Sequence, residues 1–221
     1  MKVILSREEI EKLIQAAGSI RDKLIIAMLY HTGLRVSELA NLKLDDIDVK
    51  TGVVRVDRGM RSRGRLAKYN PEHIGTLMNL WLRKERKSYP NAGNTDYFFL
   101  SKTGRKLSVL AILKIVHKVA KWAGIQKIKG RFADGRPIYG VLPHLLRRTF
   151  ASHALEDGTR PEDIRHFMGG ASPSVTIAYL NARQRECLRD SYEKHFKGAS
   201  ARRTRRPRSN VRKNTKRGEK A

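Results

Sequence analysis

The spacing of apolar residues near the start of the chain predicts two helices. Apolar residues recur at helical spacing over residues 10–17, after Ser6 and Glu9, which have the S-x-x-E spacing of a capping box. Residues 20–31 are strongly apolar and stop just before Gly33, a residue that commonly ends a helix. The chain therefore opens with two consecutive helices that have apolar faces to bury.

A small sheet is expected next. A short helix is predicted near residue 37, and the β-branched run at residues 53–56 then favours a strand. Residues 58–64 form a basic, glycine-containing turn, from which residues 65–69 are expected to return as a second, antiparallel strand. Pro71 suits the first turn of a helix, which we expect to run to about residue 86.

In the second half of the chain, the spacing of apolar residues predicts mostly helix. Residues 97–100 read as a short strand or extended piece, and residues 125–141 as irregular, basic chain. Further helices are expected at residues 108–124, 145–157, 161–168, 173–180 and 183–196. The predicted fold class is α+β, mostly α, with a small antiparallel sheet.

Composition narrows the class of protein. The chain has 221 residues, of which 47 are Lys or Arg and 21 are Asp or Glu, for a net charge of +26. A single cysteine, Cys187, excludes a disulfide-stapled miniprotein, and no apolar run is long enough for a membrane span. The N-terminus lacks the apolar stretch of a signal peptide, so we expect a cytoplasmic, nucleoid-associated protein with no membrane contact. Such a large excess of positive charge indicates a polyanion partner, most simply nucleic acid.

The charge is divided between two regions. Residues 197–221 contain eleven Lys or Arg and one acid, for a net charge of +10, and they have almost no large aliphatic side chains. Such a segment cannot bury enough apolar surface to fold, so we predict a disordered tail that contacts phosphates. Its expected DNA contacts include Arg202, Arg203, Arg205 and Arg206. Residues 1–196 carry the remaining +16 and form the predicted folded domain.

Three local patterns could carry chemistry. Residues 32–39 read T-G-L-R-V-S-E-L and put Arg35 at a helix junction, where it could equally form only a surface salt bridge. In the second pattern, His144 and Arg147 share a helix face and could hold one anion, although incidental surface charge is an equal alternative. In the third, residues 164–172, a helix is expected to stop at the glycine pair 169–170; Tyr179 follows, and a lone tyrosine would more often be a packed aromatic.

Taken in order, these patterns resemble the tyrosine recombinase (integrase) superfamily, which includes phage integrases and Xer recombinases. The family's boxes read like T-G-L-R-x-S-E-L, then H-x-L-R-H-T-F-A-T-H, then L-G-H-x-S with a tyrosine nine residues after its histidine. Here the second box is residues 144–153, and Tyr179 lies nine residues after Gly170. The resemblance covers about residues 1–196, the family's catalytic domain, and includes a basic β-hairpin after the first box.

The resemblance implies a DNA strand-transfer enzyme that needs neither cofactor nor metal. Tyr179 would be the nucleophile that forms a 3′-phosphotyrosyl link and frees a 5′-hydroxyl. Arg35 and Arg147 would clamp the phosphate oxygens, and His144 would be a general acid/base and phosphate contact. Further DNA contacts are expected from the basic turn and the second box, at Arg58, Arg61, Arg63, Arg65 and Arg148.

Two side chains depart from the family pattern. The histidine of the third box is Gly170 here, and His166, one helical turn earlier, is the candidate substitute. The family also places a lysine in the hairpin turn to protonate the leaving oxygen, whereas residues 58–65 contain only arginine. Arginine holds its proton too tightly to be an easy acid. Lys68, on the expected return strand, is the candidate general acid; otherwise this acid is missing or comes from elsewhere.

The expected partner is double-stranded DNA, bound by a homo-oligomer that in this family is commonly a tetramer. Relatives usually carry an N-terminal core-binding domain, and we expect no such domain upstream of residue 1. The basic tail would then replace part of that contact, or the chain is a naturally partial integrase, or it works with another protein. One alternative is a catalytically weak or inactive DNA-binding protein derived from this fold. Another is an unrelated basic RNA- or ribosome-binding protein, and a topoisomerase IB shares the chemistry but matches the boxes less well.

Overall fold

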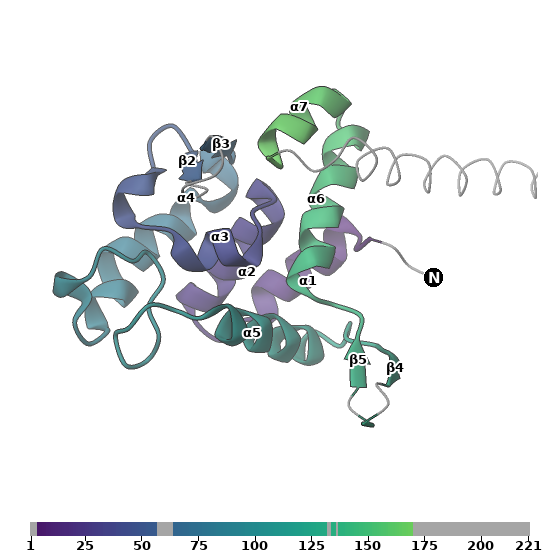
Figure 1. Cartoon of the computed structure of the whole chain (residues 1–221), viewed down its shortest axis with the longest axis horizontal. Coiled ribbons are helices and arrows are strands. Elements are labelled where there is room, and N and C mark those ends of the chain that lie inside the picture. The colour runs from purple at the N-terminus through teal and green to yellow at the C-terminus, as the bar shows by residue number, and fades with distance from the viewer. Residues whose placement is uncertain (1–3, 57–63, 132–133, 136, 170–221) are drawn as a thin grey trace, which may run out of the picture. The chain divides into compact units, whose positions relative to one another are not determined.

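A computed structural model describes residues 4–56, 64–131, 134–135 and 137–169 of the chain (Figure 1). The predicted helices at residues 173–180 and 183–196, the tail and the domain boundary at residue 196 lie outside these residues. The main elements are α1 (Arg7–Ala16), α2 (Ile20–Thr32), α3 (Val36–Asn41), β1 (Ile47–Asp48), β2 (Val53–Val56), β3 (Arg65–Lys68), α4 (Pro71–Leu80), α5 (Val109–Trp122), β4 (Ile128–Arg131), β5 (Pro137–Tyr139), α6 (Pro143–Glu156) and α7 (Pro161–Phe167).

Side-chain caps explain where the first helices begin. The Ser6 hydroxyl accepts a 3.3 Å hydrogen bond from the Glu9 amide, and the Ser6 amide donates to the Glu9 carboxylate at 2.9 Å, so the predicted capping box is complete. Ser19 caps α2 by accepting from the Asp22 amide at 3.1 Å. The Glu85 carboxylate accepts a further 2.7 Å bond from the Ile20 amide, which ties the start of α2 to the end of the helical segment after α4.

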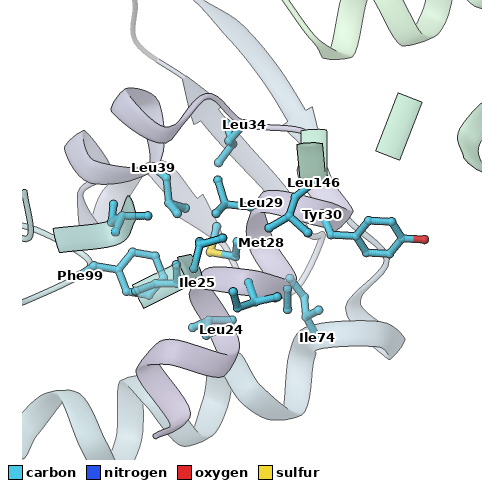
Figure 2. Close-up of a cluster of buried hydrophobic side chains, with 14 of the residues drawn as sticks. Leu24, Ile25, Met28, Leu29, Tyr30, Leu34, Leu39, Ile74, Phe99 and Leu146 are labelled. Carbon is cyan, nitrogen blue, oxygen red and sulfur yellow. The ribbon is translucent and has the colours of Figure 1, made fainter. Parts of the chain in front are cut away.

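Helix α2 forms the centre of the hydrophobic core (Figure 2). It is buried on nearly all sides because it packs against α1, α3, α4, α5 and α6. A helix that is apolar all round belongs inside a domain, and the continuous run from Leu24 to Leu29 is fully buried. The C-terminus of α2, which carries the first of the three sequence boxes, is therefore fixed by the whole core.

The predicted hairpin is present and belongs to a three-stranded antiparallel sheet, in the order β1-β2-β3. Val56 pairs with Arg65 at the end next to the turn, and Val53 pairs with Lys68 at the other end. Burial alternates along β3, so Arg65 and Ala67 face the interior, and Leu66 and Lys68 face outward. The expected fold class, mostly α with a small antiparallel sheet, is confirmed.

One sequence-based prediction is wrong. Residues 125–141 were expected to be irregular, but β4 and β5 pair there as an antiparallel hairpin with a register shift between Ile128 and Gly130. Figure 1 shows this hairpin well apart from the three-stranded sheet. Residues 128–131 and 137–139 show no alternation of apolar and polar positions that would predict strands, and it is backbone pairing that defines them.

The segment after α4 stays helical to residue 88 through a wide π turn (Trp81–Glu85) and a 3₁₀ turn (Arg86–Ser88). Arg86 is buried and donates hydrogen bonds of 2.8–3.0 Å to the carbonyl oxygens of Ala92, Thr95 and Tyr97, which holds the following loop. Residues 97–100 are extended and make isolated bridges rather than a strand. Among the residues that the structure describes, no helix is long and apolar enough to cross a membrane.

Candidate active site

The first box forms a tight turn between α2 and α3. Gly33 ends α2 with a φ of 59°, in the left-handed region that favours glycine. A Cβ atom at Gly33 would lie 2.5 Å from Cδ1 of Phe150, so the ring from α6 also requires a glycine here. Arg35 follows as the first residue before α3, and its amide donates a 2.7 Å hydrogen bond to the Glu38 carboxylate. The turn thus aims the Arg35 side chain away from the core.

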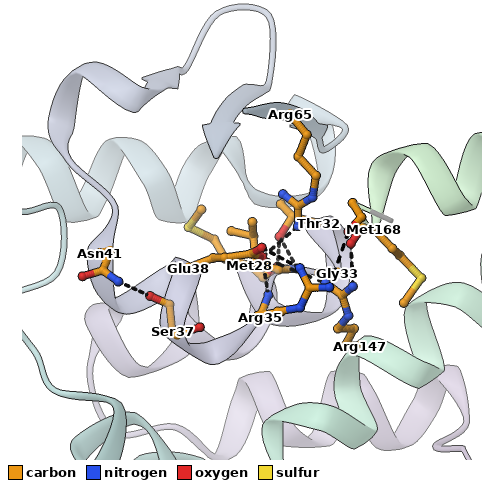
Figure 3. Close-up of polar contacts among 12 residues, drawn as sticks. Met28, Thr32, Gly33, Arg35, Ser37, Glu38, Asn41, Arg65, Arg147 and Met168 are labelled. Atoms are coloured by element: carbon orange, nitrogen blue, oxygen red, sulfur yellow. Dashed lines mark hydrogen bonds and ion pairs between the residues drawn. The ribbon is translucent and has the colours of Figure 1, made fainter. Parts of the chain in front are cut away.

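Glu38 is the centre of a cluster of arginines (Figure 3). Its Oε1 atom accepts a 2.9 Å hydrogen bond from Arg35 Nη1, and its Oε2 atom accepts a 2.8 Å bond from Arg65 Nη2. Arg147 Nη1 lies 4.0 Å from the same Oε2 atom. Three guanidinium groups from three elements therefore surround a single carboxylate, so positive charge exceeds negative charge among these four side chains.

Arg147 is held inside the protein by backbone carbonyl groups. It lies on α6 with a side chain only 5% exposed, and its Nη1 atom donates to the carbonyl oxygen of Gly33. Its Nη2 atom donates a 2.6 Å hydrogen bond to the carbonyl oxygen of Met168, at the end of α7. The Arg35 side chain, which is 41% exposed, reaches the next carbonyl of that segment, with 3.4 Å between Nη2 and Gly169 O. The two arginines thereby join all three sequence boxes.

His144 lies one helical turn before Arg147, in the first turn of α6 after Pro143. Its side chain is exposed on the whole, yet the pKa of His144 is lowered from its ordinary value, first by partial desolvation and then by the positive charges of Arg148 and Arg147. The neutral imidazole is therefore favoured near pH 7. A neutral ring can accept a proton, which is the form that a general base requires.

The other two candidate acids lie elsewhere. Lys68 points to the face of β3 opposite Arg65 and lines a cavity of about 610 Å³ together with His31 and His73. His166 is exposed on α7, whereas it is the following backbone carbonyls of Met168 and Gly169 that reach the two arginines. The structure therefore brings Arg35, Arg147 and His144 to one region, and Lys68 faces a cavity that Phe150 of α6 and Phe167 of α7 also line.

The predicted DNA contacts divide into two groups. Arg65 is buried in the Glu38 cluster, and Arg148 on α6 is half-buried. The remaining predicted side chains, together with Gly170 and the candidate nucleophile, lie outside the described residues: Arg58, Arg61, Arg63, Tyr179, Arg202, Arg203, Arg205 and Arg206. Their roles stay predictions.

Glu38 belongs to the first box, T-G-L-R-V-S-E-L, in which the sequence analysis assigned a role to Arg35 alone. The signal was the spacing of a capping box. A glutamate at the third position of a helix can accept a hydrogen bond from the amide of the residue just before the helix. The carbonyl oxygens of Gly33 and Met168 left no signal in the sequence, since any residue supplies a carbonyl. Within the described ranges, no group of three or more His, Cys, Asp or Glu side chains is arranged to hold a metal ion.

The cluster is suited to binding an oxyanion. Guanidinium groups make forked hydrogen bonds to phosphate and carboxylate oxygens and stay charged at any physiological pH. Arg35 offers the exposed guanidinium, and Arg147 lies behind it on the same carboxylate. With His144 next to them, the arrangement can bind a phosphate group and exchange a proton with it.

Comparison with known proteins assigns the family. A model of the phage integrase family matches residues 4–186. Tyrosine recombinase XerA from Pyrococcus furiosus is 35% identical over 180 residues, which is 79% of this chain and 56% of that protein. XerA from Pyrococcus horikoshii is 32% identical over 193 residues, 86% of this chain and 60% of that protein. A crystal structure of XerA recombinase matches with a TM-score of 0.72 at 31% identity, over 88% of this chain and 65% of that one.

The chain spans about three fifths of the length of these curated relatives. The family match nevertheless covers all three boxes and the elements that position Arg35 and Arg147. The resemblance seen in the sequence is thereby confirmed, and the chain belongs to the phage integrase family of tyrosine recombinases.

Proposed function

We propose that this chain is the catalytic part of a site-specific DNA recombinase that cleaves and rejoins DNA through a 3′-phosphotyrosyl intermediate. The observation that carries the proposal is the junction of Arg35 and Arg147, which lie far apart in the sequence but meet at Glu38 and at the end of α7. A charged, partly buried pair of guanidinium groups is what a pentavalent phosphate with growing negative charge requires.

In the proposed reaction, the Tyr179 hydroxyl attacks the phosphorus atom of the DNA backbone. A bond forms between Tyr179 Oη and phosphorus as the bond from phosphorus to the 5′-oxygen breaks. Arg35 and Arg147 stabilise the non-bridging oxygens, and His144, whose lowered pKa favours the neutral ring, accepts the tyrosine proton. Attack by a 5′-hydroxyl reverses these steps, so the energy of the phosphodiester bond is kept in the intermediate.

The leaving 5′-oxygen needs a proton, and Lys68 is the candidate donor, with His166 as a candidate replacement for the family histidine. Replacing the 5′-oxygen by sulfur tests Lys68, because a thiolate leaves without protonation. If Lys68 is the acid, K68A is slow on the natural substrate and recovers on the 5′-thio substrate. Equal slowing on both substrates would remove Lys68 from this role.

The central experiment is covalent capture on nicked duplexes. Because the target sequence is unknown, we would incubate the protein with a pool of nicked duplexes bearing random arms, denature it and sequence the DNA that stays attached. Wild type should form adducts, Y179F should form none, and Y139F is a matched control because that ring contacts the His117 ring on α5. An adduct that persists in Y179F would assign the nucleophile to another residue.

A second candidate is a DNA-binding protein of the same fold with weak or no cleavage. The replacement of the third-box histidine by Gly170 and the arginine-only turn favour it, because both remove a group that assists catalysis. Losing one oxyanion donor costs on the order of 3 kcal/mol in other enzymes. DNA binding without any adduct would support this candidate.

The proposal includes double-stranded DNA as the partner, bound by a tetramer on two duplexes. It also includes a separate protein that contributes the core-binding contact, and a cytoplasmic, nucleoid-associated location. The mass of the complex on one and on two duplexes, measured by light scattering, tests the assembly. A single copy per duplex that never pairs two duplexes would contradict a recombinase tetramer.

A further inference from the structure

Arg65 occupies an unusual place for an arginine in a basic hairpin. It is the first residue of β3, directly after the turn, and pairs with Val56 of β2. Burial along β3 alternates, so Arg65 shares the interior face of the strand with Ala67. Its side chain is only 5% exposed. A side chain that contacts DNA phosphates needs to reach the surface, and this one points into the domain.

Its partner there is Glu38. The distance from Arg65 Nη2 to Glu38 Oε2 is 2.8 Å, and the Glu38 side chain is only 9% exposed. The same Oε2 atom accepts a 2.7 Å hydrogen bond from the Arg35 amide, while Oε1 holds the Arg35 guanidinium at 2.9 Å. Arg65 therefore contacts the carboxylate that orients the proposed phosphate-binding arginine.

A glutamate carboxylate turns freely about its last bond unless both oxygens are held, because that torsion has a broad energy profile. Arg65 holds Oε2 from the sheet together with the Arg35 amide, and the Arg35 guanidinium holds Oε1. With Oε2 fixed, Oε1 stays directed at Arg35, and Arg147 keeps its place 4.0 Å away on the other side. Through the buried Arg65 side chain, the sheet thus helps to fix the geometry of this site.

We propose that Arg65 is a positioning residue for strand cleavage, which acts through Glu38 to hold the Arg35 guanidinium in place, and not a direct DNA contact. This inference rests on the proposed function. The Glu38 carboxylate also leaves positive charge available to a phosphate, although it pairs with Arg35. Glu38 is shared among three arginines, so the cluster holds Arg35 in position while it stays cationic overall.

The test separates positioning from DNA contact. We would compare R65Q and R65K with R55Q, which removes an exposed arginine from the neighbouring strand β2. At saturating protein, R65Q should form the covalent adduct roughly 10- to 100-fold more slowly, the cost of a displaced catalytic group. Its affinity for DNA and the salt dependence of that affinity should stay within about twofold of wild type, and R65K should recover part of the rate because the charge returns.

Coupling to Glu38 gives the sharper readout. If Arg65 acts through Glu38, the R65Q/E38Q double variant should cleave no more slowly than the slower single variant, because both changes break the same contact. If the rate losses of the two single variants multiply in the double variant, the proposal is overturned. Evidence of a direct DNA contact would also overturn it. In that case R65Q would bind DNA more weakly, its salt slope would fall by about 0.9, and its saturating rate would stay unchanged. A purely structural role would lower the melting temperature of R65Q and leave its saturating rate unchanged.

A readout that does not require cleavage keeps this proposal distinct from the proposed function. In protein with ¹⁵N-labelled arginine, the guanidinium protons of Arg35 should exchange with water slowly in wild type and at least several-fold faster in R65Q. Equal exchange rates would overturn the positioning role even in a protein that cleaves DNA. Faster exchange in a protein that forms no adduct would keep the role of Arg65 and reject the proposed strand cleavage.

Discussion

Arg147 Nη2 donates a 2.6 Å hydrogen bond to the carbonyl oxygen of Met168, and this contact ties the second sequence box to the third. The carbonyl belongs to the last turn of α7, two residues before Gly170. The donor side chain is buried, and the Arg35 guanidinium reaches the next carbonyl oxygen, of Gly169. The site is thus assembled by side chains that bind backbone as well as by side chains that bind each other.

Replacing Arg147 by lysine should separate charge from geometry. Lysine keeps the charge but has a single ammonium on a flexible stem, so it cannot bond the Gly33 and Met168 carbonyl oxygens in the same fork. We expect R147K to lose about 100-fold or more in the rate of adduct formation. R160K is the matched control, because Arg160 is exposed and paired with Asp163. Equal rates for R147K and wild type would show that charge alone is sufficient.

Replacing Gly33 by alanine should destabilise the protein and impair the site together. An alanine would have to adopt a φ of 59° and would place its Cβ against Phe150. Backbone strain of this kind costs about 1–3 kcal/mol. Urea unfolding of G33A measures the loss, and G93A is the control because a Cβ there meets nothing within 4 Å. Similar stabilities for the two variants would contradict the assigned strain.

Removing the hydroxyl of Tyr30 should weaken the contact between α2 and α6. Tyr30 Oη lies 2.8 Å from His153 Nδ1, and both side chains are buried. We expect Y30F to lower the free energy of unfolding by about 1 kcal/mol, the usual net value of a buried hydrogen bond. Calorimetry of Y30F and Y139F compares the two tyrosines. A larger loss in Y139F would show that the hydrogen bond contributes little.

Acid should destabilise the protein partly through His31. Burial, and secondarily the nearby His73, lower the pKa of His31 to about 4. The unfolded chain titrates near 6.5, so it binds more protons than the folded chain between pH 4 and 6.5, and stability falls as the pH falls through that range. His31 should account for about 1–2 kcal/mol of the loss between pH 7 and pH 5.

Urea unfolding of H31Q at both pH values tests this assignment. The variant should lose less stability on acidification than wild type, and H166Q, at an exposed position on α7, should retain the wild-type loss. An identical pH dependence in H31Q and wild type would assign the acid sensitivity to other groups.

Deleting residues 197–221 should flatten the salt dependence of DNA binding. The segment contributes eleven Lys or Arg, and each phosphate contact adds about 0.9 to the slope of log affinity against log salt concentration. A chain of full length with these residues changed to glutamine controls for length. An unchanged slope in both variants would exclude the segment from DNA contact.

The sequence by itself predicted the helices that have strong end signals. Ser6 begins α1 and Gly33 ends α2 as predicted, because capping is local chemistry between residues a few positions apart. It also identified the three boxes and the family, since their residue types and order do not depend on how the chain packs. It missed the β4-β5 hairpin, because strands of four and three residues are too short to show a periodic pattern.

Only the tertiary structure decided what surrounds each box. Arg65 and Lys68 are both basic residues of one strand, yet Arg65 is buried against Glu38 and Lys68 lines a separate cavity. The carbonyl oxygens that hold Arg147 come from residues 114 and 21 positions away in the chain. Contacts of this range depend on how α2, α6, α7 and the sheet pack around one core. Local sequence determines which groups are available, and packing determines which of them meet.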